Sequence, residues 1–144
     1  MTDKEYKEWE VALEKSEKRN NNLLIEFKEY LTKKGLSQKT IDNHILNIEF
    51  FANGFLLRYD IIPIEEGFSE IGSFLGDYFI RKSSWASKYT IQENIASFKK
   101  FYTFLNEKGM VTNDELSEMK MLIKDEKQAW IEEVEWYWNN LLDQ

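Results

Sequence analysis

The apolar residues of this chain recur at intervals of three and four positions along most of its length. The stripe is clear from Leu23 to Leu31 and again from Ile41 to Phe55. Because an α-helix has about 3.6 residues per turn, this spacing places the apolar side chains on one face of a helix. Only one Pro and six Gly occur in 144 residues, too few for the frequent turns of a sandwich of short strands. The pattern therefore predicts an all-α fold.

Residues that favour helix N-termini stand ahead of four apolar stripes. Ser37, Ser69 and Ser87 each precede one stripe, where a serine hydroxyl can accept a hydrogen bond from a backbone N–H of the first turn. Thr112 and Glu115 have the spacing of a capping box ahead of the last stripe. We expect a helix to begin directly after each of these caps.

Glycines and polar runs predict where the helices end. Gly35 and Gly109 follow apolar stripes, as expected for residues that close a helix in the left-handed conformation. The run Asn20–Asn22 is expected to separate a short N-terminal accessory helix, residues 1–22, from the next helix. The second long helix should end near Leu57, and a break or bend is expected near Lys127, which the last stripe skips.

The composition excludes several kinds of site. With no Cys and a single His, the chain can form no disulfide, no thiol nucleophile and no histidine-rich metal cluster. No apolar run approaches the roughly 18 residues that a membrane span requires. We therefore expect a cytoplasmic protein with no cofactor and no membrane contact.

The net charge of −7 is concentrated near the C-terminus, where residues 110–144 hold nine acidic and three basic residues. An acidic total disfavours generic binding to polyanions. The remainder of the chain is close to neutral, so it can still present a basic face.

Two of the predicted helices correspond to one another at an offset of fifty residues. Each has a serine cap, a polar first turn and a long apolar seam; the matching positions are Ser37, Thr40, Ile41 and Ile45 with Ser87, Thr90, Ile91 and Ile95. One such pair is too few for a solenoid. We expect both helices to pack on the same core and to expose their polar N-terminal turns together.

These residues carry a resemblance to a known family. Residues 24–31, Leu-Ile-Glu-Phe-Lys-Glu-Tyr-Leu, are followed by Gly35-Leu36-Ser37-Gln38-Lys39-Thr40-Ile41 and later by Tyr89-Thr90-Ile91 and Phe98-Lys99-Lys100-Phe101-Tyr102. Over residues 24–109 the chain resembles the core-binding domain of tyrosine recombinases, also called phage integrases. The resemblance implies a four-helix SAM-like bundle at residues 23–109, with the accessory helix before it and an acidic, aromatic helical extension at residues 110–144.

The resemblance also implies that the chain binds double-stranded DNA. In that family the second and fourth helices lie toward the major groove. The matching positions here are Ser37, Gln38, Lys39, Thr40, Asn43 and Asn47, and then Ser87, Lys88, Thr90, Asn94, Lys99 and Lys100. Hydroxyls, helix N-terminal amides and lysines can hold phosphates, and asparagine can contact adenine edges.

The family's catalytic residues are missing. Only 35 residues follow Gly109, fewer than a catalytic domain needs, and none of the three Arg lies beyond Arg81. We therefore expect a stand-alone, non-enzymatic DNA-binding module linked to DNA integration or recombination. Glu93, in the helix that begins at Ser87, would repel phosphate.

Several residues allow more than one interpretation. His44 lies at the edge of an apolar seam, where a packing role is expected. Lysines 33 and 34 could contact phosphate or compensate the negative end of a helix dipole.

The aromatic residues of the C-terminal extension point to a second hypothesis. Three adjacent aromatic side chains cannot all face one side of a helix, because neighbours point about 100° apart. The extension could fold back on the four-helix core, hinder DNA access through its charge, or form an interface with a second copy or with a complete recombinase. The candidate interface residues are Trp130, Trp136, Tyr137 and Trp138. The alternative function is accordingly a protein-interaction or dimerisation module that has lost its affinity for DNA.

Overall fold

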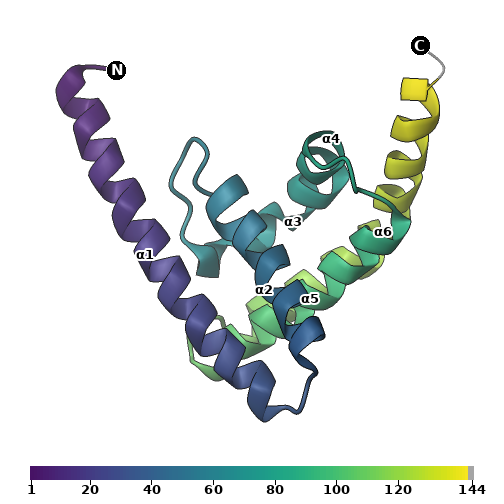
Figure 1. Ribbon diagram of the computed structural model, residues 1–144, viewed down its shortest axis with the longest axis horizontal. Helices are drawn as coiled ribbons and strands as arrows, with labels where there is room; N and C mark the ends of the chain where they lie inside the picture. Colours follow the sequence, from purple (N-terminus) through teal and green to yellow (C-terminus); the bar gives the residue numbers. More distant parts are fainter. Residues whose placement is uncertain (143–144) are drawn as a thin grey trace. The chain divides into compact units, whose positions relative to one another are not determined.

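The computed structural model describes residues 1–142, and all regular secondary structure in that range is helical. The prediction of an all-α fold is confirmed (Figure 1). The chain divides into two compact units, Met1–Gly67 (unit 1) and Phe68–Gln144 (unit 2). The last two residues of the predicted extension, Asp143 and Gln144, lie outside the described residues. The SAM-like arrangement of the core helices stays a prediction.

Unit 1 consists mainly of a long helix and a shorter one that pack against each other. Helix α1 spans Asp3–Lys33, α2 spans Gln38–Glu49, and a π-helical segment, η1, continues α2 over Phe50–Phe55. Gly35 has φ +83° and ends α1 as predicted, with the Leu36 N–H donating to the carbonyl oxygen of Leu31 at 3.4 Å. A 3₁₀ segment, η2, spans Ile64–Glu70.

Helix α1 runs without interruption through the three asparagines, so the predicted helix boundary at Asn20–Asn22 is wrong. Asn20 is buried, and its side-chain amide donates to Asn53 Oδ1 at 2.9 Å. Asn53 in turn donates to Asn21 Oδ1 at 3.1 Å. These contacts satisfy amides that would otherwise disfavour the helix, because buried polar groups are costly when they are unpaired.

Two further polar contacts join α1 to the segment that follows η1. Trp9 Nε1 donates to the carbonyl oxygen of Tyr59 at 3.1 Å, and Arg19 donates to both carboxylate oxygens of Glu65 at 2.8 and 2.9 Å. Burial acts to raise the pKa of Glu65, but hydrogen bonds from Arg19 and the backbone, together with the Arg19 charge, outweigh it. The pKa of Glu65 therefore lies below its usual 4.5.

Unit 2 begins with a helical stretch of mixed geometry, composed of α3 (Ile71–Ser73), η3 (Phe74–Tyr78, π-helical) and α4 (Phe79–Lys82). The prediction that Ser69 caps this stretch is wrong. Glu70 precedes α3 without a side-chain cap, and the 3₁₀ turns of η2 end there.

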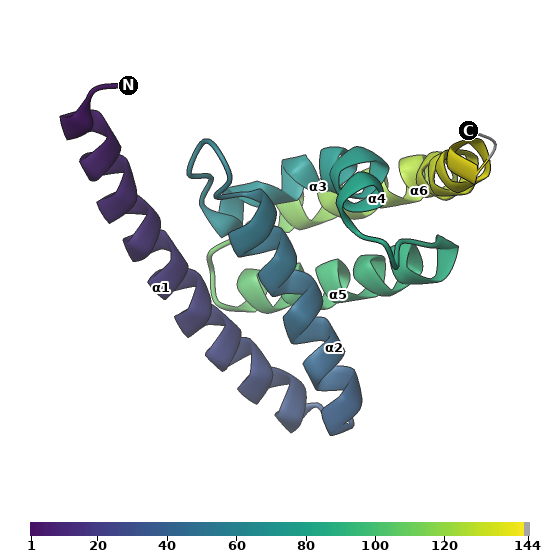
Figure 2. The same cartoon turned by 45° about the horizontal axis from the view of Figure 1, so that its top comes forward.

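Helices α5 (Lys88–Glu107) and α6 (Asn113–Leu142) complete unit 2 and lie alongside each other (Figures 1 and 2). The predicted stop at Gly109 is confirmed by its φ of +80°. The capping box is also confirmed, because Thr112 N–H donates to Glu115 Oε1 at 2.9 Å and Glu115 N–H donates to Thr112 Oγ1 at 3.1 Å.

Helix α6 is continuous, so the chain has no break at Lys127. Figure 1 shows that α6 changes direction before its last turns, which are drawn in yellow. Trp130 of α6 is 4% exposed and packs against two glycines of the α3–η3 stretch. A Cβ atom added at Gly76 would lie 2.9 Å from Trp130 Cδ1, and one added at Gly72 would lie 4.0 Å from Trp130 Cζ2.

The core of unit 2 is aromatic. The ring of Phe74 meets that of Phe98 edge to face at a centroid distance of 6.0 Å, and the rings of Phe101 and Tyr102 meet in the same way at 5.4 Å. All four side chains are fully buried. The apolar stripe predicted for α5 therefore forms this core. None of the helices within residues 1–142 combines the length and the apolar character that crossing a bilayer requires.

Candidate nucleic-acid interface

The start of α2 in unit 1 is exposed and free of acidic residues. Ser37 Oγ accepts a hydrogen bond from Thr40 N–H at 3.3 Å and donates to Thr40 Oγ1 at 2.9 Å, which confirms the predicted cap. The side chain of Gln38 is held by Asp42, to which it donates at 2.7 Å. Of the positions predicted to contact DNA, five in this unit are exposed and one, Asn47, is half-buried; the exposed five are Ser37, Gln38, Lys39, Thr40 and Asn43.

Two further lysines adjoin this helix start. Lys33 and Lys34 end α1 and are exposed, and Lys34 Nζ lies 5.2 Å from the centroid of the Tyr30 ring. From Thr32 to Ile41 the sequence contains three lysines and no acidic residue. This segment is therefore the basic feature of unit 1, and we name it the α1–α2 turn.

The start of α5 in unit 2 repeats the local geometry of α2. Ser87 Oγ accepts from Thr90 N–H at 3.2 Å, and Ser87 N–H donates to Thr90 Oγ1 at 2.8 Å. Both hydroxyls take part in the cap, and both residues are half-buried. Lys88 is exposed, with its Nζ 5.6 Å from the centroid of the exposed Tyr89 ring.

The remaining candidates on α5 differ in exposure. Asn94 is only 3% exposed, and its Nδ2 donates to the carbonyl oxygen of Thr90 at 2.8 Å. Its predicted role at the DNA surface is therefore wrong, because the side chain is buried and its amide is hydrogen-bonded to the preceding turn of the same helix. Lys99 and Lys100 are exposed, as is Glu93, which lies seven residues before Lys100 and thus on nearly the same side of the helix.

The four long helices differ in the charge of their first turns. Helix α1 begins with Asp3 and Glu5, and α6 begins with Asp114 and Glu115. Neither α2 nor α5 has an acidic residue in its first turn. Acidic side chains compensate the partial positive charge of a helix N-terminus, so α2 and α5 retain a positive electrostatic potential that α1 and α6 have neutralised.

All three arginines are engaged within their own units. Arg19 pairs with Glu65, and Arg58 donates to the carbonyl oxygen of Phe55 at 2.6 Å. Arg81 binds Asp77, and its guanidinium lies 5.5 Å from the centroid of the Tyr137 ring. The lysines therefore supply the cationic groups at the candidate interface.

The candidate interface residues of the C-terminal helix differ in their exposure to solvent. Trp130 is buried against its own unit, so its predicted role in an interface between chains is wrong. Trp138 is half-buried, and its Nε1 donates to the carbonyl oxygen of Ala86 at 2.8 Å. Tyr137 is also half-buried, while Trp136 is 56% exposed. The expectation that the extension folds back on the core is confirmed for α6 within unit 2.

Sequence reasoning missed two exposed aromatic residues at the start of α5. Trp85 is 58% and Tyr89 is 69% exposed. The sequence could have indicated this exposure, because both residues flank the Ser87 cap and precede Ile91, the first residue of the apolar stripe of α5. His44 is buried within α2, as the packing role requires.

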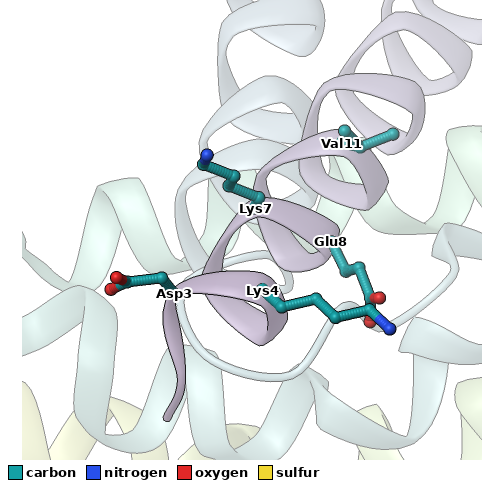
Figure 3. Close-up of a pocket in the computed structure, with 5 residues that line it drawn as sticks. All are labelled: Asp3, Lys4, Lys7, Glu8 and Val11. Atoms are coloured by element: carbon teal, nitrogen blue, oxygen red, sulfur yellow. The ribbon is translucent and has the colours of Figure 1, made fainter.

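An open hollow of about 560 Å³ lies along the first turns of α1 and is lined by Asp3, Lys4, Lys7, Glu8 and Val11 (Figure 3). Its charges are mixed in sign, and it includes none of the predicted site residues. Within residues 1–142, no group of three or more His, Cys, Asp or Glu side chains could hold a metal ion.

Comparison of the chain with protein-family models, curated proteins and solved structures finds no match.

Proposed function

We propose that this chain is a non-catalytic, integrase-like module that binds double-stranded DNA through the phosphate backbone. The observation that carries the proposal is the contrast among the first turns of the long helices. Helices α2 and α5 are capped by serine, lack first-turn acids and are accompanied by exposed lysines, whereas α1 and α6 carry acids there.

The chemistry of these helix starts suits phosphate. A helix N-terminus presents unpaired backbone N–H groups and a partial positive charge, which together favour an anionic oxygen. In unit 1, Lys33, Lys34 and Lys39 would add full charges beside α2. In unit 2, Lys88, Lys99 and Lys100 would do the same along α5.

The expected binding is tolerant of sequence. Bidentate contact of arginine with guanine is the commonest specific contact in the major groove, and all three arginines here are engaged elsewhere. Lysine–phosphate contacts position a protein on DNA without reading bases. A link to DNA integration or recombination follows from the sequence resemblance.

The proposal is tested by measuring the affinity of the full chain for random-sequence duplex as a function of salt. Two triple variants remove the lysines of one unit each: Lys33→Gln/Lys34→Gln/Lys39→Gln and Lys88→Gln/Lys99→Gln/Lys100→Gln. Each lost phosphate contact reduces the slope of log K against log salt by about 0.9, so each variant should flatten the slope by up to about 3.

A matched control carries Lys4→Gln/Lys7→Gln/Lys15→Gln, which makes the same change in net charge on the outer part of α1. Its salt slope should equal that of the unaltered chain. The proposal fails if the unaltered chain does not bind duplex at low salt, or if the control loses as much of the slope as the other two variants.

A further inference from the structure

One end of unit 2 contains an open hollow of about 490 Å³ between the start of α5 and the last turns of α6. We name it the α5–α6 hollow. Tyr89 and Trp138 supply its aromatic lining, and Lys88 and Glu135 supply its charges; the other lining residues are Ala86, Ser87, Val134 and Asn139. The hydrogen bond from Trp138 Nε1 to the Ala86 carbonyl oxygen fixes α6 beside α5 at this point.

Large apolar side chains are exposed around the same hollow. Trp85 immediately precedes Ala86, Tyr89 lines the hollow, and Trp136 and Leu141 lie within three residues of lining residues of α6; their exposed fractions are 58%, 69%, 56% and 44%. Exposed apolar surface marks interaction sites on soluble proteins where it is extensive, and tryptophan and tyrosine are enriched at interfaces.

Trp136 has a particular relation to the hollow. It precedes Asn139 by three residues, so one of its neighbours on the helix surface lines the hollow. Its own side chain is not among the lining residues and extends from the adjacent face of α6 toward solvent. An exposed indole thus lies one helical turn from Asn139, a residue of the aromatic recess.

This arrangement is self-complementary. An interface with two-fold symmetry requires one patch to carry both halves of the contact, so that a group on each copy meets its counterpart on the other. A cavity of about 150 Å³ is large enough for benzene, so the α5–α6 hollow has ample room for one indole ring.

We propose that two copies of this chain associate through this end of unit 2, with Trp136 of each copy seated in the α5–α6 hollow of the other. Tyr89 and Trp138 would contact the inserted ring. Lys88 and Glu135 line the hollow with opposite charges. In a two-fold interface, Lys88 of each copy would face Glu135 of the other.

Sedimentation of the full chain at concentrations from about 1 µM to about 1 mM measures this association. The unaltered chain should form dimers, and Trp136→Ala should raise the dimer dissociation constant at least about tenfold, as expected for a central interface tryptophan. Met121→Ala is the matched control, because Met121 is 64% exposed on α6 but does not line the hollow. It should leave the dissociation constant unchanged.

A mixing experiment separates this contact from other modes of dimerisation. Asn139→Trp places an indole in the chain's own hollow, so this variant keeps Trp136 but has no open recess. Trp136→Ala keeps the recess and has no indole to insert. Each variant alone should be monomeric, while a mixture of the two should recover association through one of the two contacts.

Three results would overturn the proposal: a monomer at all concentrations, an equal loss of association in Met121→Ala, or a mixture no more associated than its components. Circular dichroism should show unchanged helicity in each variant, since Trp136 and Asn139 are exposed. Binding to duplex DNA is measured in parallel; its absence would defeat the proposed function without affecting this one.

Discussion

Each unit contains one long helix that is attached to a π-helical segment, but the contacts that make the attachment differ between the units. In unit 1, α1 is held at η1 by an amide network in which Asn20 donates to Asn53 at 2.9 Å. In unit 2, α6 is held at η3 by Trp130, whose ring leaves no room for a Cβ atom at Gly76. The first attachment depends on hydrogen bonds and the second on shape.

Both attachments involve a π-helical segment, η1 in unit 1 and η3 in unit 2. The wider turn of a π-helix disturbs the regular backbone hydrogen-bond pattern. In η1 the altered backbone is accompanied by a polar contact, since the side chain of Asn20 also reaches the Ala52 carbonyl oxygen at 3.4 Å. In η3 the same kind of turn contains Gly76 and accommodates an indole ring.

The largest effect is expected from Trp130→Ala. Removing this buried side chain leaves a cavity against Gly72 and Gly76, and the free energy of unfolding should fall by about 3–5 kcal/mol. Denaturant unfolding followed by circular dichroism measures the loss. A loss below about 1 kcal/mol would show that shape does not hold α6 in place.

A pair of glycine substitutions compares the two π-helical segments directly. Gly76→Ala should destabilise the chain by about 1–3 kcal/mol, because the new methyl group would meet Trp130 Cδ1 at 2.9 Å. Gly54→Ala in η1 meets only Phe50 Cδ1 at 3.9 Å and should stabilise the chain by about 0.5–1 kcal/mol. Thermal unfolding of both variants should therefore shift in opposite directions, and shifts of the same sign would contradict the contrast.

Asn20→Ala tests the polar attachment of α1. The substitution leaves the Asn53 carboxamide oxygen without its donor, and the free energy of unfolding should fall by about 1–2 kcal/mol. Asn22→Ala serves as the control, because Asn22 is exposed on the same helix. Equal free energies of unfolding for the two variants would show that the amide network does not hold α1 in place.

The smallest effect is expected from Glu65→Gln, which should cost about 0.2–1 kcal/mol at neutral pH because the Arg19 side chain is 46% exposed and solvent screens the ion pair. Since the pKa of Glu65 is lowered in the folded state, its contribution is complete above its usual 4.5 and is lost as the pH falls through the folded value. Unfolding curves of the two proteins should therefore converge in acid. A difference that grows below pH 4.5 would show that the ion pair is not its source.

Local features of the sequence predicted most of the helix limits. The caps at Ser37, Ser87 and Thr112, and the stops at Gly35 and Gly109, depend on residues within one turn of each other, so their spacing is sufficient. Most residues of the apolar stripes are likewise buried, although Leu141 of the last stripe is 44% exposed.

The errors concern contacts between residues distant in the sequence or polar groups on apolar faces. Asn20 is compatible with a helix because Asn53 accepts its hydrogen bond, and the ring of Trp130 occupies space that only a glycine at position 76 leaves open. Asn94 looked like a surface residue because its type is polar, yet its amide is satisfied by the Thr90 carbonyl of the preceding turn. The predicted DNA positions other than Asn94 stay a prediction.

The π-helical turns also bear on which deletions this chain can absorb. Loss of one residue from an α-helix rotates everything beyond it by about 100° and moves the apolar stripe off its face. A π-helical turn holds one residue more than an α-turn, so a deletion there can convert it to an α-turn while the flanking segments keep their phase. Segments Phe50–Phe55 and Phe74–Tyr78 are therefore places where the chain can be shortened by one residue with its helices still in register.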